Sequence, residues 1–265
     1  MNPTQATSLT TKAAFGASPW LGQAAKSTVN PGGLNLASSA SYEPTGSGYQ
    51  RQLTSVKPAG TATTSTNTYY QANEAYGTAL GLATAVCNLP LSTPQSGMLK
   101  TTTGPTSAAG TSQSTTTIYD LFGRVVGQKS TGNNGWTCTT YDARGRTTSV
   151  AHSAVGALPA RTASFSYVSA GGDPLTTSAQ DPTGTVATVS DLLGRPVSYT
   201  DVWGTVTTSL YDQVGRLVSA TATPPNSSDQ PQTESYTYNV DSQITQVNFA
   251  TGTSTPMGIT SVACC

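Results

Sequence analysis

The chain has 265 residues, of which 12 are Lys or Arg and 12 are Asp or Glu, so its formal net charge is zero. Only 9% of the residues are charged, and Thr, Ser and Gly dominate the rest, a composition typical of β-proteins. Neither sign of charge forms a run, and no stretch has the length and apolarity of a spanning helix, so we expect no nucleic-acid partner and no membrane span.

The first part of the chain shows little internal order. Residues 1–40 are expected to be poorly ordered or to hold degenerate repeats, and they lack the pattern of a signal peptide. Residues 41–110 contain two weak copies of a turn pattern, Tyr42-Glu43-Pro44-Thr45-Gly46 and Lys57-Pro58-Ala59-Gly60-Thr61. The Ala-rich stretch 72–91 interrupts them and indicates an insertion, either a short helix or irregular structure.

Four cysteines are present, at 87, 138, 264 and 265, without the spacing of a zinc site, so no metal is expected. Cys87 and Cys138 lie in the two least repetitive parts of the sequence, each before a strand-like run. One interpretation is a disulfide that ties the insertion to a sheet in an oxidising compartment, and the other is a pair of free thiols. Cys264 and Cys265 belong to an incidental C-terminal tail, residues 251–265.

Residues 111–250 are built from a short repeat. Tyr119-Asp120-Leu121-Phe122-Gly123-Arg124 introduces the pattern Asp-x-x-Gly-Arg, which occurs four times, and two weaker copies lack the arginine. Around the later copies the step is about ten residues, which fits a short strand plus a turn in an antiparallel meander. The repeated turn residues are Asp120, Gly123 and Arg124; Asp142, Gly145 and Arg146; Asp181 and Gly184; Asp191, Gly194 and Arg195; Asp201 and Gly204; and Asp212, Gly215 and Arg216.

Each residue of the repeat has a physical role. The Asp carboxylate accepts hydrogen bonds from backbone N–H groups further along the turn, and Gly supplies the positive φ that returns the chain to a strand. The flanking runs are rich in β-branched and aromatic residues, which predicts strands. We expect Tyr119, Tyr141 and Tyr211 to form one row, and the arginines to contact a Tyr ring or the turn Asp of a neighbouring hairpin.

These units resemble the YD-repeat family, which includes bacterial Rhs proteins, toxin-complex shell subunits and teneurins. The resemblance is strong over about 110–250. It implies an all-β fold, in which antiparallel hairpin repeats form a segment of a spiralling β-shell. It also implies a structural function without catalysis or cofactor: the chain would form part of a secreted or cell-surface wall that encloses and delivers a toxin passenger. Its partners would be that passenger and the remainder of a larger Rhs-type shell.

Other functions have weaker support. Asp-x-x-Gly also contacts phosphate in GTPases, but the nearest approach to a P-loop, Gly127-Gln128-Lys129-Ser130, lacks the required Gly-Lys pair. His152 is the one histidine and has no accompanying nucleophile motif. Periodic placement explains the Asp residues as turn residues without an acid–base pair. The main alternative is an adhesion or carbohydrate-binding module in which Trp136 and Trp203 stack on glycans.

Overall fold

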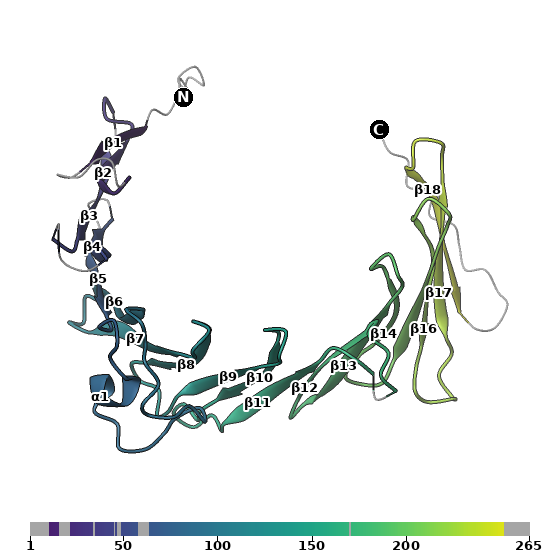
Figure 1. Ribbon diagram of the computed structural model, residues 1–265. Coiled ribbons are helices and arrows are strands. Elements are labelled where there is room, and N and C mark those ends of the chain that lie inside the picture. The colour runs from purple at the N-terminus through teal and green to yellow at the C-terminus, as the bar shows by residue number, and fades with distance from the viewer. Residues whose placement is uncertain are drawn as a thin grey trace. The chain divides into compact units, whose positions relative to one another are not determined.

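A computed structural model describes residues 11–15, 22–33, 35–44, 46, 49–57, 64–169 and 171–251. These residues form 18 strands and one short helix (Figure 1). The expected all-β fold of antiparallel hairpins is therefore confirmed. The first elements are β1 (Thr11–Phe15), β2 (Ala24–Val29), β3 (Leu36–Tyr42), β4 (Gln52–Val56), β5 (Thr64–Tyr69), α1 (Tyr76–Leu80), β6 (Leu99–Thr106), β7 (Ser112–Tyr119), β8 (Val125–Ser130) and β9 (Thr137–Tyr141).

The remaining strands follow in the same manner and are joined by short turns. They are β10 (Thr147–His152), β11 (Arg161–Ser166), β12 (Thr176–Asp181), β13 (Gly184–Ser190), β14 (Pro196–Thr200), β15 (Val206–Tyr211), β16 (Leu217–Thr223), β17 (Gln232–Tyr238) and β18 (Ile244–Thr251). Neighbours in sequence pair antiparallel, as β12 and β13 do from Thr176↔Val189 to Asp181↔Gly184. Antiparallel neighbours need only a tight turn between them, which the repeated Asp-x-x-Gly pattern supplies.

The chain divides into two compact units. Unit 1 comprises 1–139 and 152–160, and unit 2 comprises 140–151 and 161–265. Strands β1 and β2 and most of β3 lie within residues 1–40, the segment that was expected to be poorly ordered or degenerate. The expected tail, with Cys264 and Cys265, lies outside the described residues except for Thr251, the last residue of β18. Most of the weak repeat copy at 57–61 also lies outside them.

Unit 1 contains a small core beneath the insertion between β5 and β6. The buried apolar side chains are Tyr70, Tyr76, Ile118, Tyr119 and Val126. Two of them come from the insertion and three from β7 and β8, so the insertion covers one face of these strands. The predicted short helix is α1, which ends at Gly81 in the left-handed conformation with φ 63°. We call residues 70–98 the cap.

Polar contacts also fix the cap to the sheet. Gln95 is fully buried, and its side chain brackets Tyr119: the Tyr119 N–H donates to Oε1 at 2.8 Å, and Nε2 donates to the Tyr119 carbonyl at 3.0 Å. The hydroxyl of Tyr70 donates to the Thr117 carbonyl at 2.8 Å. Each bond satisfies a backbone group of β7 that would otherwise be buried without a partner.

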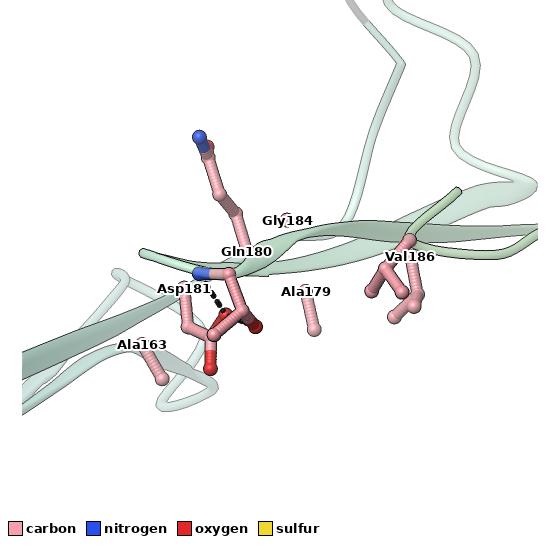
Figure 2. A pocket seen from close by; sticks show the side chains of 8 residues that line it. Ala163, Ala179, Gln180, Asp181, Gly184 and Val186 are labelled. Atoms are coloured by element: carbon pink, nitrogen blue, oxygen red, sulfur yellow. Dashed lines mark hydrogen bonds between the residues drawn. The ribbon is translucent and has the colours of Figure 1, made fainter. Parts of the chain in front are cut away.

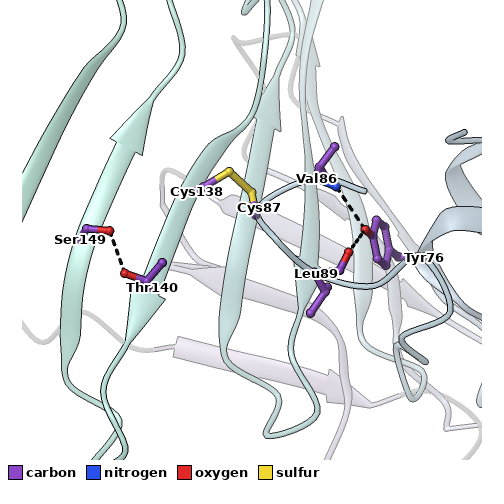
Figure 3. Close-up of a disulfide and its surroundings, with 7 residues drawn as sticks. All are labelled: Tyr76, Val86, Cys87, Leu89, Cys138, Thr140 and Ser149. Carbon is purple, nitrogen blue, oxygen red and sulfur yellow. Dashed lines mark hydrogen bonds between the residues drawn. A yellow bond between two sulfur atoms is a disulfide. The ribbon is translucent and has the colours of Figure 1, made fainter. Parts of the chain in front are cut away.

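A disulfide joins the cap to β9, and Figure 3 shows it beside the hydrogen bonds that Tyr76 makes with Val86 and Leu89. It connects Cys87 and Cys138, the pair considered from the sequence. Gly127 on β8 allows the close approach of the cap, because a Cβ there would lie 2.7 Å from Ile118 Cγ1 and 3.0 Å from Cys87 Sγ. A larger residue at 127 would push the cap away from the sheet.

Unit 2 is built differently. None of the described residues from 140 to 250 is buried, and large apolar side chains such as Leu192, Leu193 and Val214 lie exposed in its turns. The strands have no second layer over them among these residues. Backbone pairing and contacts between adjacent hairpins therefore hold this sheet together, in place of a hydrophobic core.

Replacing Gln95 with Leu tests the two hydrogen bonds that fix the cap to Tyr119. Both backbone groups of Tyr119 would lose their buried partner, so we expect the free energy of unfolding of unit 1 to fall by about 2–3 kcal/mol in chemical denaturation. Gln128→Leu, at an exposed position of β8, is the matched control and should change it by less than about 0.5 kcal/mol. Equal losses in both variants would contradict the role assigned to Gln95.

Candidate functional site

The repeated unit is a turn closed by both backbone and side-chain bonds. In the last full copy, the Gly215 N–H donates to the Asp212 carbonyl at 3.0 Å, and the Asp212 N–H donates to the Arg216 carbonyl at 2.9 Å. Oδ1 of Asp212 accepts the N–H groups of Val214 and Arg216 at 3.1 and 2.9 Å. Gly215 has φ 90°, a conformation that strongly favours glycine.

The arginine of each copy pairs with the aspartate of its own turn. Nitrogen–oxygen distances are 2.6 to 2.7 Å in all four copies, Asp120–Arg124, Asp142–Arg146, Asp191–Arg195 and Asp212–Arg216. We expected each arginine to contact a Tyr ring or the turn Asp of a neighbouring hairpin, and the aspartate that it contacts belongs to its own turn. The turn itself explains the difference, because the arginine directly follows the glycine and its backbone N–H is already bonded to the same carboxylate.

Arg146, Arg195 and Arg216 each also stack on a tyrosine from the next hairpin, and Arg124 lies over the ring of Phe122 in its own turn at 5.0 Å. Arg195 lies over the ring of Tyr211 at 4.7 Å, and the Tyr211 hydroxyl donates to the Pro196 carbonyl at 2.8 Å. Arg216 and Tyr238 repeat this stacking at 4.7 Å, and the Tyr238 hydroxyl donates to Leu217 at 2.6 Å. The tyrosine thus makes two contacts with the preceding hairpin. Its ring stacks on the arginine, and its hydroxyl bonds to the carbonyl of the residue that follows that arginine.

This arrangement, which we call the Arg–Tyr tie, occurs twice more within single units. In unit 2, Arg146 lies 4.2 Å from the Tyr167 ring, whose hydroxyl donates to Thr147. In unit 1, Arg51 lies 4.3 Å from the Tyr69 ring, whose hydroxyl donates to Gln52. Each tie joins one hairpin to the next, so the sheet is built from coupled neighbours.

In the unit 1 tie, a glutamate replaces the aspartate. Glu43 pairs with Arg51 at 2.6 Å across a longer turn, and the Glu43 N–H donates to the Arg51 carbonyl as in the shorter turns. Arg51 also donates to the carbonyls of Tyr70 and Gly97, at the two ends of the cap. Glu43, which begins this turn, belongs to the weak copy predicted at residues 42–46.

Several turns keep the backbone geometry with different side chains. Asp201 accepts from the N–H groups of Trp203 and Thr205, although Thr205 stands where arginine stands elsewhere. In the turn from Asn239 to Gln243, Asn Oδ1 replaces the carboxylate, and Ser242 takes the positive φ of the missing glycine at 62°.

Two more turns of this kind were missed from the sequence because serine occupies the aspartate position. The Gly110 N–H donates to the Ser107 carbonyl, and the Gly172 N–H donates to the Ser169 carbonyl. In both turns the serine hydroxyl accepts the N–H that Asp Oδ1 accepts elsewhere, from Thr111 or Asp173. Ser-x-x-Gly is the sequence signal that would have revealed them.

The weak copy at 181–184 makes a tighter hairpin, because Asp181 and Gly184 pair directly as the ends of β12 and β13. Beside it lies a hollow of about 210 Å³, shown in Figure 2, where Ala163, Ala179 and Asp181 point to one side of the sheet and Gln180 to the other. Asp181 is the one carboxyl group that lines it. Glycoside hydrolysis uses two such groups, so this hollow does not provide that chemistry.

The remaining candidate residues stand apart from one another. Trp203 is 79% exposed at a turn of unit 2, while Trp136 is half-buried in unit 1. His152 is exposed at the end of β10. The described part of the chain contains no group of three or more His, Cys, Asp or Glu residues placed to hold a metal, and no helix long and apolar enough to cross a membrane.

The ion pairs and turn bonds stabilise the charged form of the carboxyl groups. The backbone N–H of Arg216 and then its side chain lower the pKa of Asp212, and the Arg195 side chain does so for Asp191. The strongest effect is at Glu43, where hydrogen bonds from Arg51 lower the pKa from 4.5 to about 2. These carboxyl groups are therefore ionised partners in structural pairs, without the raised pKa of a general acid.

Acid should weaken the Glu43–Arg51 turn. A carboxyl group whose pKa is lower in the folded state stabilises that state above its unfolded pKa, so this contribution is present above pH 4.5 and is lost as the pH falls toward 2. We expect NMR titration of the Glu43 carboxyl carbon to give a midpoint near 2. Arg51→Gln should move that midpoint up toward 4.5, whereas Arg144→Gln should leave it unchanged.

Removing one hydroxyl tests the Arg–Tyr tie. Tyr238→Phe keeps the ring over Arg216 but loses the 2.6 Å hydrogen bond to Leu217, which should lower the free energy of unfolding of unit 2 by about 0.5–1.5 kcal/mol in urea denaturation. Tyr199→Phe, on β14, is the control and should have an effect within about 0.5 kcal/mol. If Tyr238→Phe leaves the free energy of unfolding unchanged, the hydroxyl contributes nothing to the coupling of hairpins.

Comparison with known proteins identifies structural neighbours only. No protein-family model matches the chain, and no curated protein matches it. A mutant Tc holotoxin pore of Photorhabdus luminescens is similar at 14% identity and a TM-score of 0.41, over 91% of this chain and 15% of that one. The TcdB2-TccC3-Cdc42 structure is similar at 13% identity and a TM-score of 0.37, over 89% and 15%. The chain thus spans about 15% of the length of these neighbours.

Proposed function

We propose that this chain forms a wall segment of an Rhs-type YD-repeat shell that encloses and delivers a toxin passenger. The observation that carries the proposal is the sheet of unit 2, in which no described residue is buried and adjacent hairpins are joined by Arg–Tyr ties. Such a sheet grows by adding hairpins along one direction and needs no core of its own. A container wall requires both properties.

The composition supports the same role. The strands present mainly Thr, Ser and Ala, and the carboxylates of Asp142, Asp191 and Asp212 are paired with the arginines of their own turns. Neither face of the unit 2 sheet therefore offers a strong field or a large charge cluster to a passenger. A wall of this kind holds its contents by enclosing them, with little specific binding to any one surface.

The proposed wall segment is non-catalytic, needs no cofactor and works outside the cytoplasm. Asp191 and Asp212 serve as turn residues, and their lowered pKa values suit ion pairing. The Cys87–Cys138 disulfide supports a secreted or cell-surface location, because such bonds persist in oxidising compartments. The partners are the remainder of a larger shell and the passenger inside it.

Protease protection of the passenger tests the proposal. In a polypeptide that contains this chain with its flanking sequence, the passenger should resist limited proteolysis. Replacing Arg195 and Arg216 together by Ala removes two ties and should make the passenger cleavable at least about tenfold faster. Arg144→Ala, at an exposed turn position, is the matched control. A passenger that is cleaved equally fast in all three proteins would reject the container role.

One observation favours the alternative of a carbohydrate-binding module. Trp203 is 79% exposed at its turn, although its backbone N–H is fixed by Asp201 at 2.9 Å. A solvent-facing indole is suited to stacking on a sugar ring. Glycan-array binding that is abolished by Trp203→Ala and kept by Trp136→Ala would support adhesion over containment.

A further inference from the structure

The turn before β18 has the form of the turns that receive a tyrosine, and none of the rings in the described part of the chain docks on it. Asn239 to Gln243 fold like Asp212 to Arg216, and Gln243 stands at the arginine position. In the occupied sites, the hydroxyl of the incoming ring bonds to the carbonyl of the next residue. Here that residue is Ile244, whose side chain is 51% exposed.

A hollow of about 720 Å³ lies along this part of β18. It is lined by the turn residues Asn239, Ser242 and Gln243 and by the strand residues 244–247. No residue of β17 (Gln232–Tyr238) lines it, although β17 pairs with β18 along its length. The hollow therefore opens on the side of β18 away from β17, where the next strand of the sheet would lie.

A tyrosine hydroxyl also docks beside a glutamine in this fold. Gln23 precedes β2 as Gln243 precedes β18, and the hydroxyl of Tyr42 donates to the Ala24 carbonyl at 3.1 Å. The Gln23 side chain donates to the Gln50 carbonyl at 2.6 Å, which fixes it at this position. The site at Gln243 and Ile244 thus has an occupied counterpart in the same chain.

The first described strand presents a ring of the matching kind. Phe15 ends β1 as Tyr42 ends β3, and each pairs with the following strand across a register shift, Phe15↔Ala24 and Tyr42↔Gln52. Phe15 is 50% exposed. The rings that dock in the Arg–Tyr ties lie at the ends of odd-numbered strands, and their acceptor turns precede even-numbered ones. Phe15 lies at the end of the odd-numbered β1, and the turn at Gln243 precedes the even-numbered β18, so a contact between the two would follow the same alternation.

We propose that β1 of a second copy of this chain adds antiparallel to β18 and places Phe15 in the hollow beside Gln243 and Ile244. The contact continues the hairpin-to-hairpin interface already present within the chain, with backbone hydrogen bonds along the two strands. It joins unlike surfaces of the two copies, so it is open-ended and produces head-to-tail oligomers. This inference goes beyond the proposed wall function, because it states how copies extend the sheet.

Sedimentation velocity of the purified chain over a wide concentration range tests the contact. The wild type should form oligomers that lengthen with concentration. Phe15→Tyr adds a hydroxyl that can donate to the Ile244 carbonyl and should tighten association by up to about tenfold. Phe15→Ser removes the ring and should weaken it at least about tenfold. Circular dichroism identifies any variant that fails to fold.

Phe122→Ser is the matched control, since Phe122 is 83% exposed at a turn that takes no part in the proposed contact. Association that is lost in Phe122→Ser and kept in Phe15→Ser would overturn the proposal, as would a monomer at every concentration or a closed dimer. The chain is measured alone, so these outcomes are independent of whether a passenger is protected.

A cross-link locates the contact. In a background with Cys264 and Cys265 replaced by Ser, the variants Phe15→Cys and Gln243→Cys should form a disulfide-linked heterodimer when mixed under oxidising conditions. Each variant alone should give far less linked product, because its new cysteines do not meet. Equal yields from the mixture and from either single variant would place the contact elsewhere.

Discussion

A tyrosine ring resting on the arginine of the preceding hairpin is the contact on which this sheet depends. The arginine is already fixed by the aspartate of its own turn, so the ring meets a guanidinium that has little freedom left to lose. Exposed ion pairs and cation–π contacts each contribute up to about 1 kcal/mol, which is small alone. Repetition makes the sum large, and stability then resides in pairs of neighbouring hairpins, as in other repeat proteins.

The two units are stabilised by different interactions. Unit 1 adds the cap, which buries Tyr70, Tyr76 and Gln95 against β7 and is closed by a disulfide. Unit 2 has no buried residue among those described and relies on its ties. A single break in unit 2 therefore loosens one junction, whereas loss of the cap removes the core of unit 1.

The sequence reveals the parts of this fold that depend on local geometry. Asp-x-x-Gly-Arg predicts a turn because four of its five residues take part in the same few hydrogen bonds, and the alternation of turns and β-branched runs predicts the hairpins. The partner of each arginine was harder to predict, because Tyr167 and Tyr238 reach it across loops of variable length. Gln95 gave no signal, since its role depends on the cap folding back over Tyr119. Ser242 shows that the glycine position tolerates another residue.

The disulfide also has a mechanical consequence. Antiparallel hairpins in series peel apart one at a time when a chain is pulled from its ends, so a sheet of this kind yields at low force. Cys87 and Cys138 close a loop of 51 residues that contains most of β6 to β9. About 170 Å of extended chain is thereby withheld from stretching until the bond is reduced. Unit 1 would therefore lengthen far more under tension in a reducing environment than in an oxidising one.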